Sequence, residues 1–383
     1  MNIRTGIIGC GAMTMGAYVP ALQAMPEVYT VTAVADPGEE RRDLAGDVLG
    51  LPRSARFASG YELLGAELDA VLIVTPPQVR AEFAVAAASA GKNVLCEKPL
   101  ATRPADAAMA IQAAADNGVR LAAAHNYLWF AEYAAAREAI AAGEIGDVEV
   151  VQINALGVWD NAGAANSAYN WRYDPAAGGG GVLMDMLHLV YVAEDLCGLP
   201  FTAVSGYVNS HRPGFQVETV ALCRFETEVN AALVNVGWGF GGGGATISGS
   251  KGRIDIRYQD GGTSPFSPLE AVTIATADGT RELPVTPNRD TIPQVLADFA
   301  DSLATGRAPR ADGSAGLRTL EAVIGTYASA ARGCNVALPL DAADPMYLRG
   351  VAGLPETPTS YSSPVVGKKL FGSAKEARER LAS

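Results

Sequence analysis

The sequence predicts an α/β protein with an N-terminal doubly wound parallel sheet and a C-terminal α+β domain that has a large, mostly antiparallel open sheet. Short apolar runs alternate with Ala-rich helical stretches over the first 125 residues, whereas longer strand-like runs follow one another after about residue 146. The length of 383 residues suits two domains of ordinary size. We therefore expect domains at 1–125 and 126–340, followed by a tail at 341–383.

Composition argues against several functional classes. The chain has 41 Asp and Glu against 29 Lys and Arg, and its formal net charge of −12 disfavours binding to nucleic acid or anionic membranes. Its 5 cysteines form neither a CxxC pair nor the spacing of a zinc site, so we expect reduced thiols and no metal. No signal-peptide pattern or membrane-spanning apolar run is present. We expect a cytoplasmic protein.

The strands predicted for the first domain are each followed by a helical stretch. They read TGIIG, VTAVAD, AVLIVT, KNVLC and VRLAAA. Repeated strand–helix units form parallel sheets, and ligands bind at the edge where the carboxyl ends of the strands meet. Residues that directly follow these runs are therefore the first candidates for a binding site.

The second domain is predicted from strand-like runs at 147–158, 201–209, 217–226, 229–239, 245–258 and 270–276. Helices are predicted near 182–197 and over 292–305 and 313–332. The fourth run is apolar on both faces, because Val234, Val236 and Trp238 alternate with Ala231 and Leu233. We expect another subunit to cover its second face; cover by the C-terminal segment is the alternative.

A glycine-rich turn after the first strand suits a dinucleotide. Gly9 and Gly11 permit a tight turn, and the backbone of Ala12 and Met13 begins a helix whose N-terminus can receive a pyrophosphate. Thr14 stands at the third glycine position, so the fingerprint is incomplete. A tight turn without a ligand is the alternative.

Asp36 ends the second strand, where a carboxylate can accept hydrogen bonds from ribose hydroxyls and repel a 2′-phosphate. This favours NAD over NADP. Arg41 and Arg42 follow in the next helix and support the NADP alternative. Asp36 could instead serve as the N-cap of that helix.

Other polar residues follow the later strands. Thr75 and Pro76 are predicted to line the nicotinamide side, together with Glu97 and Lys98. The alternatives are a rigid turn that starts the next helix for the first pair and an ordinary surface turn for the second. The Lys98 ammonium can donate a hydrogen bond to a substrate hydroxyl and stabilise an alkoxide as hydride leaves. Asn126 ends the last strand and could bind nicotinamide or substrate.

Asp185 and His188 are expected to be neighbours on one face of the helix near 182–197. A carboxylate can orient a histidine and make it more basic, which suits a group that accepts a proton near neutral pH. A buried structural histidine is the alternative. Residues suited to binding a polyhydroxylated ring, or to packing within a loop, precede this helix: Trp159, Asn161, Tyr169, Trp171 and Arg172.

Together these segments resemble the glucose-fructose oxidoreductase / inositol dehydrogenase / rhizopine catabolism (Gfo/Idh/MocA) family over about residues 3–340. The resemblance rests on AGKNVLCEKPL at 90–100, on the Trp-Arg and Gly-rich segment, and on GSKG at 249–252. It implies a Rossmann domain, a nicotinamide cofactor and oxidation of sugar or polyol hydroxyls. It also implies a homo-oligomer, dimer or tetramer, formed through the C-terminal sheet. In its terms Lys98 is the Glu-Lys-Pro lysine and His188 the general base.

The chain departs from the family pattern at three positions. Asp185 lies three rather than four residues before the histidine, Arg80 replaces a histidine, and Leu128 replaces an arginine, which suggests an altered substrate pocket. We expect NAD-dependent oxidation of a ring secondary hydroxyl of a sugar, sugar derivative or cyclitol. One alternative is a redox-neutral glycoside hydrolase that uses transient oxidation, elimination, water addition and re-reduction. The other is an NAD-binding protein without catalysis.

Overall fold

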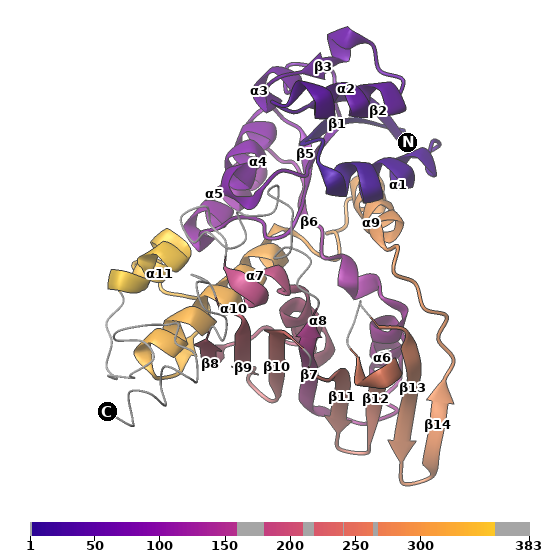
Figure 1. Cartoon of the computed structure of the whole chain (residues 1–383), viewed down its shortest axis with the longest axis vertical. Helices are drawn as coiled ribbons and strands as arrows, with labels where there is room; N and C mark the ends of the chain where they lie inside the picture. The colour runs from indigo at the N-terminus through magenta and orange to yellow at the C-terminus, as the bar shows by residue number, and fades with distance from the viewer. Residues whose placement is uncertain (1, 159–179, 210–217, 240, 263–266, 357–383) are drawn as a thin grey trace. The chain divides into compact units, whose positions relative to one another are not determined.

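The computed structural model describes residues 2–158, 180–209, 218–239, 241–262 and 267–356 (Figure 1). Its contacts divide the chain into two units: Met1–Asn126 with Asp290–Leu317, and Tyr127–Arg289 with Arg318–Ser383. The first unit contains a parallel sheet and the second a large, mostly antiparallel one, which confirms the predicted fold class. In the described part of the chain, no helix is long and apolar enough to cross a membrane.

The sheet of the first unit is parallel, with strand order β3-β2-β1-β4-β5-β6. Val71, Leu72 and Ile73 of β4 are at most 1% exposed, as expected for a parallel sheet covered on both faces. Its strands are β1 (Ile3–Ile8), β2 (Tyr29–Ala35), β3 (Arg56–Phe57), β4 (Ala70–Ile73), β5 (Asn93–Cys96) and β6 (Leu121–Ala123). Its helices include a π-helical turn (Thr14–Tyr18), α1 (Val19–Gln23), α2 (Glu39–Val48), α3 (Gly60–Leu63), α4 (Arg80–Ser89) and α5 (Pro104–Asp116).

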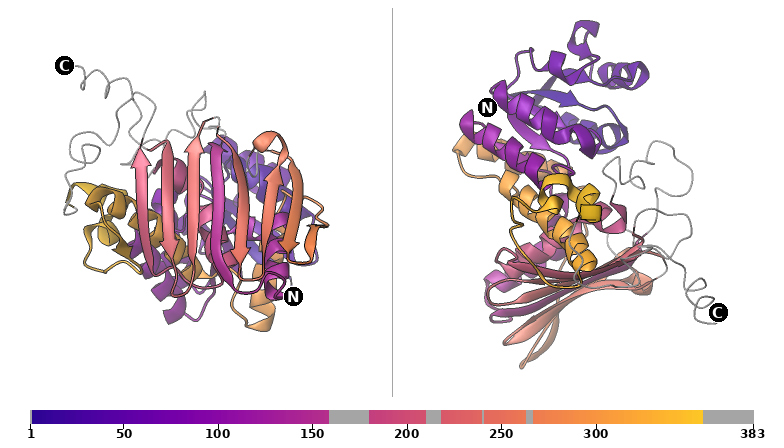
Figure 2. Two further views of the ribbon diagram at one scale, coloured as in Figure 1. Left: turned by 90° about the horizontal axis from the view of Figure 1, so that it is seen from below. Right: turned by 90° about the vertical axis from the view of Figure 1, so that its left-hand side faces the viewer.

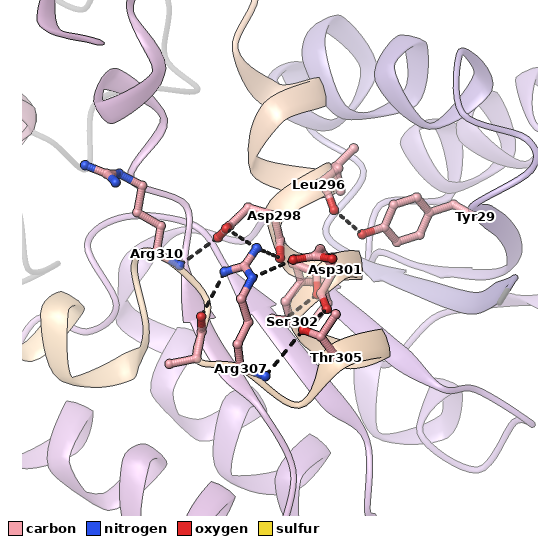
Figure 3. Close-up of polar contacts among 10 residues, drawn as sticks. Tyr29, Leu296, Asp298, Asp301, Ser302, Thr305, Arg307 and Arg310 are labelled. Atoms are coloured by element: carbon pink, nitrogen blue, oxygen red, sulfur yellow. Dashed lines mark hydrogen bonds and ion pairs between the residues drawn. The ribbon is translucent and has the colours of Figure 1, made fainter. Parts of the chain in front are cut away.

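Helix α9 (Ile292–Thr305) also belongs to the first unit, although our predicted second domain included it. The Tyr29 hydroxyl of β2 donates a hydrogen bond of 2.6 Å to the Leu296 carbonyl (Figure 3). Arg307, just beyond the helix, pairs with Asp298 at 2.7 Å. The helix therefore belongs to the first unit, although most strands of the second unit's large sheet separate it from the rest of the first unit in the sequence.

The sheet of the second unit has the order β14-β13-β12-β11-β7-β10-β9-β8-β15, and among its described strands only the neighbours β7 and β10 run parallel (Figure 2). Its strands are β7 (Val148–Val158), β8 (Ala203–Asn209), β9 (Val220–Glu226), β10 (Ala231–Trp238), β11 (Gly243–Gly249), β12 (Gly252–Tyr258), β13 (Leu269–Thr276), β14 (Gly279–Leu283) and β15 (Val336–Ala337). Its helices are α6 (Ala131–Ala141), α7 (Gly181–Asp185), α8 (His188–Cys197) and α11 (Pro345–Arg349), and α10 (Gly313–Arg332) runs across the division between the units.

Two predicted elements are each divided in the structure. The run predicted as one strand over 245–258 is the hairpin β11–β12, because the chain turns between Gly249 and Gly252 and these two residues pair with each other. The helix predicted near 182–197 is interrupted at Met186 and Leu187, so Asp185 ends α7 before α8 begins. Periodicity missed both breaks because the apolar pattern continues across them.

The two faces of the large sheet differ in exposure. Val234 and Val236 of β10 are fully buried, and α8 packs on this strand (Figure 2). The other face carries Leu222, which is 42% exposed, but also a hydrogen bond of 2.8 Å between Asn235 and Asn154. This second face is therefore less apolar than predicted, and its cover by another subunit stays a prediction.

A buried carboxyl group holds the start of α7. The Oε1 atom of Glu218 accepts a hydrogen bond of 2.9 Å from the Leu183 N–H and lies 2.9 Å from the Tyr327 hydroxyl, which also contacts the carbonyl of Gly180. Because a phenol carries one hydrogen, both contacts of Tyr327 are satisfied when Glu218 is protonated and donates its own. Burial raises the pKa of Glu218 to about 8, which is consistent with this arrangement.

Glu218→Gln is expected to flatten the pH dependence of stability. The folded-state pKa of Glu218, about 8, lies above the unfolded value, so its contribution is full at low pH and is lost as pH rises toward 8. Glutamine keeps the shape and cannot ionise. The melting temperature of the variant should therefore fall less than that of the wild type between pH 5 and pH 8, roughly the interval between the two pKa values. Exposed Glu228→Gln is the control, and equal slopes in all three proteins would contradict the assignment.

Candidate active site

The glycine-rich turn joins β1 to the first helix of its unit. Gly9 has φ +98°, and a Cβ atom there would lie 2.6 Å from the Val74 carbonyl oxygen, so only glycine fits. At Gly11 a Cβ atom would meet nothing within 4 Å. Ala12 and Met13 are exposed at the start of the helix. The turn is thus closed against β4 and open on its outer side, which suits a bound pyrophosphate.

Thr14 replaces the missing third glycine without opening the turn. It is fully buried, and its hydroxyl donates a hydrogen bond of 2.5 Å to the Gly9 carbonyl. A π-helical turn begins at this residue. The local irregularity accommodates a side chain where the usual fingerprint requires none.

Asp36 lies at the carboxyl end of β2 and is 6% exposed. Its Oδ2 accepts from the Cys10 N–H at 2.9 Å, and its Oδ1 accepts from the Gly38 N–H at 2.7 Å and from Arg41 Nε at 3.1 Å and Nη2 at 2.8 Å. Burial acts to raise the pKa of Asp36, but these hydrogen bonds outweigh it and lower the pKa below the usual value. Three of these four N–H groups donate to Oδ1 and one donates to Oδ2.

Glu97 and Lys98 follow β5 at the same edge of the sheet. Glu97 is 6% exposed; its Oε1 accepts from the Tyr18 hydroxyl at 2.9 Å, and its Oε2 accepts from the Lys98 N–H at 3.0 Å. Glu97 therefore supports the turn from within the unit. Lys98 itself is half-buried.

Arg80 joins the turns after β4 and β5. Its guanidinium donates to the carbonyls of Thr75 at 2.8 Å and Pro99 at 2.9 Å, and to the carbonyl of Lys98. Arg80 is 6% exposed. At this position, where the family pattern has a histidine, the side chain holds main-chain carbonyls, and the altered substrate pocket that the sequence suggested stays a prediction.

The remaining cofactor candidates lie in the same unit. Thr75 is buried and Pro76 is exposed. Asn126 is half-buried, and its side-chain amide donates a hydrogen bond of 3.3 Å to the Thr291 hydroxyl. The strand order β2-β1-β4-β5-β6 brings the turns after these strands together along one edge of the sheet.

His188 belongs to the second unit, as the first residue of α8. It is 7% exposed, and its Nδ1 lies 2.7 Å from the Tyr191 hydroxyl, which also accepts a hydrogen bond of 3.0 Å from the Tyr127 N–H. Asp185 is half-buried and ends the preceding helix. The two residues are therefore not neighbours on one continuous helix as predicted, and the orientation of His188 by Asp185 stays a prediction.

Tyr127 is sandwiched between two rings. Its centroid lies 3.9 Å from that of His188 and 4.2 Å from that of Phe130, with interplanar angles of 15° and 24°. Two nearly parallel rings this close to Tyr127 must lie on its opposite faces, because on one face they would overlap. The guanidinium of Arg289 extends this stack, 4.7 Å from the Phe130 centroid.

Sequence reasoning missed Tyr191 and Tyr127. An i,i+3 histidine–tyrosine pair in a helical segment could have indicated Tyr191, whereas no local signal marked the stacking of Tyr127 on His188. The predicted substrate residues Trp159, Asn161, Tyr169, Trp171 and Arg172 lie outside the described residues. Within the described ranges, no group of three or more His, Cys, Asp and Glu side chains could hold a metal ion.

Comparison with known proteins identifies the family. Residues 3–125 match the model of the oxidoreductase family with an NAD-binding Rossmann fold, and residues 133–255 match the GFO/IDH/MocA C-terminal domain. Over 315 residues the chain is 29% identical to dTDP-3,4-didehydro-2,6-dideoxy-alpha-D-glucose 3-reductase of Streptomyces violaceoruber, covering 79% of this chain and 85% of the relative. It is 28% identical to 1,5-anhydro-D-fructose reductase of Ensifer adhaerens, covering 86% and 97%.

A solved structure supports the same fold. The crystal structure of aldose-aldose oxidoreductase from Caulobacter crescentus complexed with glycerol has a TM-score of 0.77 and 24% identity, covering 88% of this chain and 100% of the other. The family matches cover both the glycine-rich turn and Lys98 in the first unit, and His188 in the second. The chain is therefore an oxidoreductase enzyme that belongs to the Gfo/Idh/MocA family and has its NAD-binding Rossmann fold.

Proposed function

We propose that this enzyme oxidises a ring secondary hydroxyl of a sugar, sugar derivative or cyclitol, with NAD as the hydride acceptor. The observation that carries the proposal is the support of Lys98 at the carboxyl edge of the parallel sheet, where its N–H is held by Glu97 and its carbonyl by Arg80. The edge of such a sheet is where α/β enzymes bind their ligands. The sugar-derivative and anhydrosugar reductases among the relatives support the substrate class.

In this proposal Lys98 donates a hydrogen bond to the reacting oxygen, and His188 accepts its proton. Bound nicotinamide supplies the hydride acceptor at C4. The pyrophosphate would be bound by Gly9, Gly11, Ala12 and Met13, and the ribose would be bound by Asp36. The proposed cofactor site is completed by Thr75, Pro76, Glu97 and Asn126. The proposed substrate-binding residues are Asp185, Trp159, Asn161, Tyr169, Trp171 and Arg172. The named relatives are reductases and an oxidoreductase, so they do not support redox-neutral glycoside cleavage.

Lys98→Met tests the reaction. With the purified enzyme, a panel of sugars and cyclitols should include substrates that yield one NADH per molecule oxidised. The variant should lose at least about a hundredfold in kcat, because a charged donor to the developing alkoxide is removed, while its affinity for NAD changes little. Lys92→Met, in the turn before β5, is the control. A Lys98 variant with more than about a tenth of wild-type kcat would remove this lysine from the mechanism.

The preference for NAD depends on the Asp36 carboxylate. Its negative charge repels a 2′-phosphate, and Glu39 and Glu40 begin the following helix. Arg41 occupies Oδ1 and has 57% of its side chain exposed, so a ribose hydroxyl can displace it at modest cost. Arg42 is held by the Asp36 carbonyl at 2.8 Å.

Arg41→Ala and Asp36→Ser are expected to change cofactor affinity in opposite directions. Removal of Arg41 frees an acceptor for the ribose and should tighten NAD binding a few-fold, whereas Asp36→Ser should favour NADP by about tenfold or more. Fluorescence titration with NADH and NADPH measures both ratios. If the wild type prefers NADPH and the Arg41→Ala variant does not, the arginine binds a 2′-phosphate and the assignment to NAD is wrong.

Tyr191 supports His188 as the base. If Nδ1 donates its hydrogen to the Tyr191 oxygen, Nε2 is unprotonated and can accept the substrate proton. The Tyr191 oxygen has two lone pairs, so it can accept from both Nδ1 and the Tyr127 N–H. In the opposite tautomer Nε2 carries the hydrogen and cannot act as the base.

Tyr191→Phe should lower kcat by about ten- to a hundredfold, because the buried ring loses the partner that selects its tautomer. The phenyl ring preserves packing, so NAD affinity and the melting temperature should change far less. His188→Asn measures the kcat that remains when the proposed base is absent. Stopped-flow measurement of a single oxidation separates chemistry from product release, and an unchanged hydride-transfer rate in Tyr191→Phe would refute the role.

We also propose that the chain forms a homo-oligomer, dimer or tetramer, through the open face of its large sheet. Support comes from Val150, Tyr207 and Leu222, which are 37%, 42% and 42% exposed on that face. A cytoplasmic location is proposed as well, since Cys10, Cys96, Cys197 and Cys223 are buried free thiols.

A further inference from the structure

Arg80 is a buried cation that donates hydrogen bonds to three main-chain carbonyls. It begins α4, is 6% exposed, and donates to the carbonyls of Thr75, Lys98 and Pro99. Burial of a guanidinium is costly unless its donors are satisfied. A planar group with several N–H donors can hold several carbonyls in a fixed relative arrangement, which lysine or histidine cannot reproduce.

These carbonyls lie where the regular hydrogen bonding of the sheet stops. The last bonds between β4, β5 and β6 run from the Glu97 N–H to the Ile73 carbonyl at 2.9 Å and from the Ala124 N–H to the Cys96 carbonyl at 2.8 Å. Beyond them, side chains hold the main chain of Lys98. Glu97 accepts a hydrogen bond from its N–H, and Arg80 donates one to its carbonyl.

We propose that Arg80 is a positioning residue, which fixes the main chain of Lys98 relative to the Thr75 turn and so directs the lysine amine toward the reacting oxygen. This inference rests on the proposed function for its catalytic consequence, whereas the link between the two turns rests on the contacts alone. Arg80 does not touch the substrate in this role. A displacement of about 1 Å in a catalytic group can reduce the rate by about a hundredfold, so loss of the link should lower kcat more than KM.

Arg80→Met removes all three hydrogen bonds and keeps much of the side-chain volume. Its control is Arg56→Met, at the far β3 edge of the sheet, because the Arg56 side chain is 9% exposed and donates to the carbonyl of Leu51 at 2.7 Å. Arg56 also pairs with Asp47 at 2.7 Å, so its removal costs at least as many polar contacts. Both variants should lose melting temperature to a similar degree. Only Arg80→Met should lose about tenfold or more in kcat, with a smaller change in KM for the sugar. Arg80→Lys retains one cationic donor group and should recover part of the lost kcat. It therefore keeps the test valid if Arg80→Met does not fold.

Lys98 can be observed without turnover. Reductive methylation with ¹³C-formaldehyde labels the amines of the chain, whose lysines are Lys92, Lys98, Lys251, Lys368, Lys369 and Lys375. The Lys98 signal is assigned by its loss in Lys98→Arg. In Arg80→Met this signal should shift or broaden while the other lysine signals remain, and in Arg56→Met it should stay as in the wild type.

The two measurements separate the possible failures. A wild type that oxidises no sugar overturns the proposed function, and the Lys98 signal then decides the positioning role alone. An unchanged Lys98 signal in folded Arg80→Met overturns the positioning role, whatever the activity. An equal fall in kcat in Arg56→Met and Arg80→Met also overturns it, because the effect would then be a general cost of losing a buried guanidinium.

Discussion

Main-chain hydrogen bonding in the parallel sheet stops at the carboxyl ends of its strands, and the groups that follow must find other partners because buried polar groups are costly when unpaired. In the first unit, side chains supply these partners. Asp36 accepts from the turn after β1, Glu97 accepts from Lys98, and Arg80 donates to the turns after β4 and β5. The rest of the candidate cofactor site depends on these bonds.

The same bonds link neighbouring turns into one network. Asp36, after β2, holds the Cys10 N–H in the turn after β1, and Tyr18 of the following helix reaches Glu97 after β5. Side-chain hydrogen bonds therefore connect the turns after β1, β2 and β5. Buried networks of this kind are rigid when every member is satisfied, which suits a site that must hold a reacting carbon close to a cofactor.

In the second unit, mostly uncharged side chains hold the start of a helix and the candidate base in place. Glu218 and Tyr327 hold the start of α7, and Tyr191 and Tyr127 hold His188 by a hydrogen bond and by stacking. The break between α7 and α8 separates Asp185 from His188 along the helix. The aromatic and phenolic groups thus form part of the surroundings of the proposed base.

The sequence by itself determined the fold class, and it predicted the edge of the sheet and the residues that we propose for the cofactor site. Short stretches of the sequence contain the signals for these features. They are the apolar runs of buried parallel strands, the Gly9 and Gly11 turn, Asp36 at a strand end, and Lys98 in its Glu-Lys-Pro segment. Each depends on residues adjacent in the chain, so spacing and residue type are sufficient to find them.

Only the tertiary structure decided how those residues are supported. The Tyr327 hydroxyl contacts the carbonyl of Gly180, which is 147 residues away, and Arg80 donates to the carbonyl of Lys98, which is 18 residues away in a different strand–helix unit. The Tyr29 hydroxyl of β2 reaches a carbonyl of α9 that is 267 residues away. Such contacts join a side chain to a distant main-chain group, and they leave no periodic pattern, because the partner contributes a carbonyl or N–H that every residue type shares.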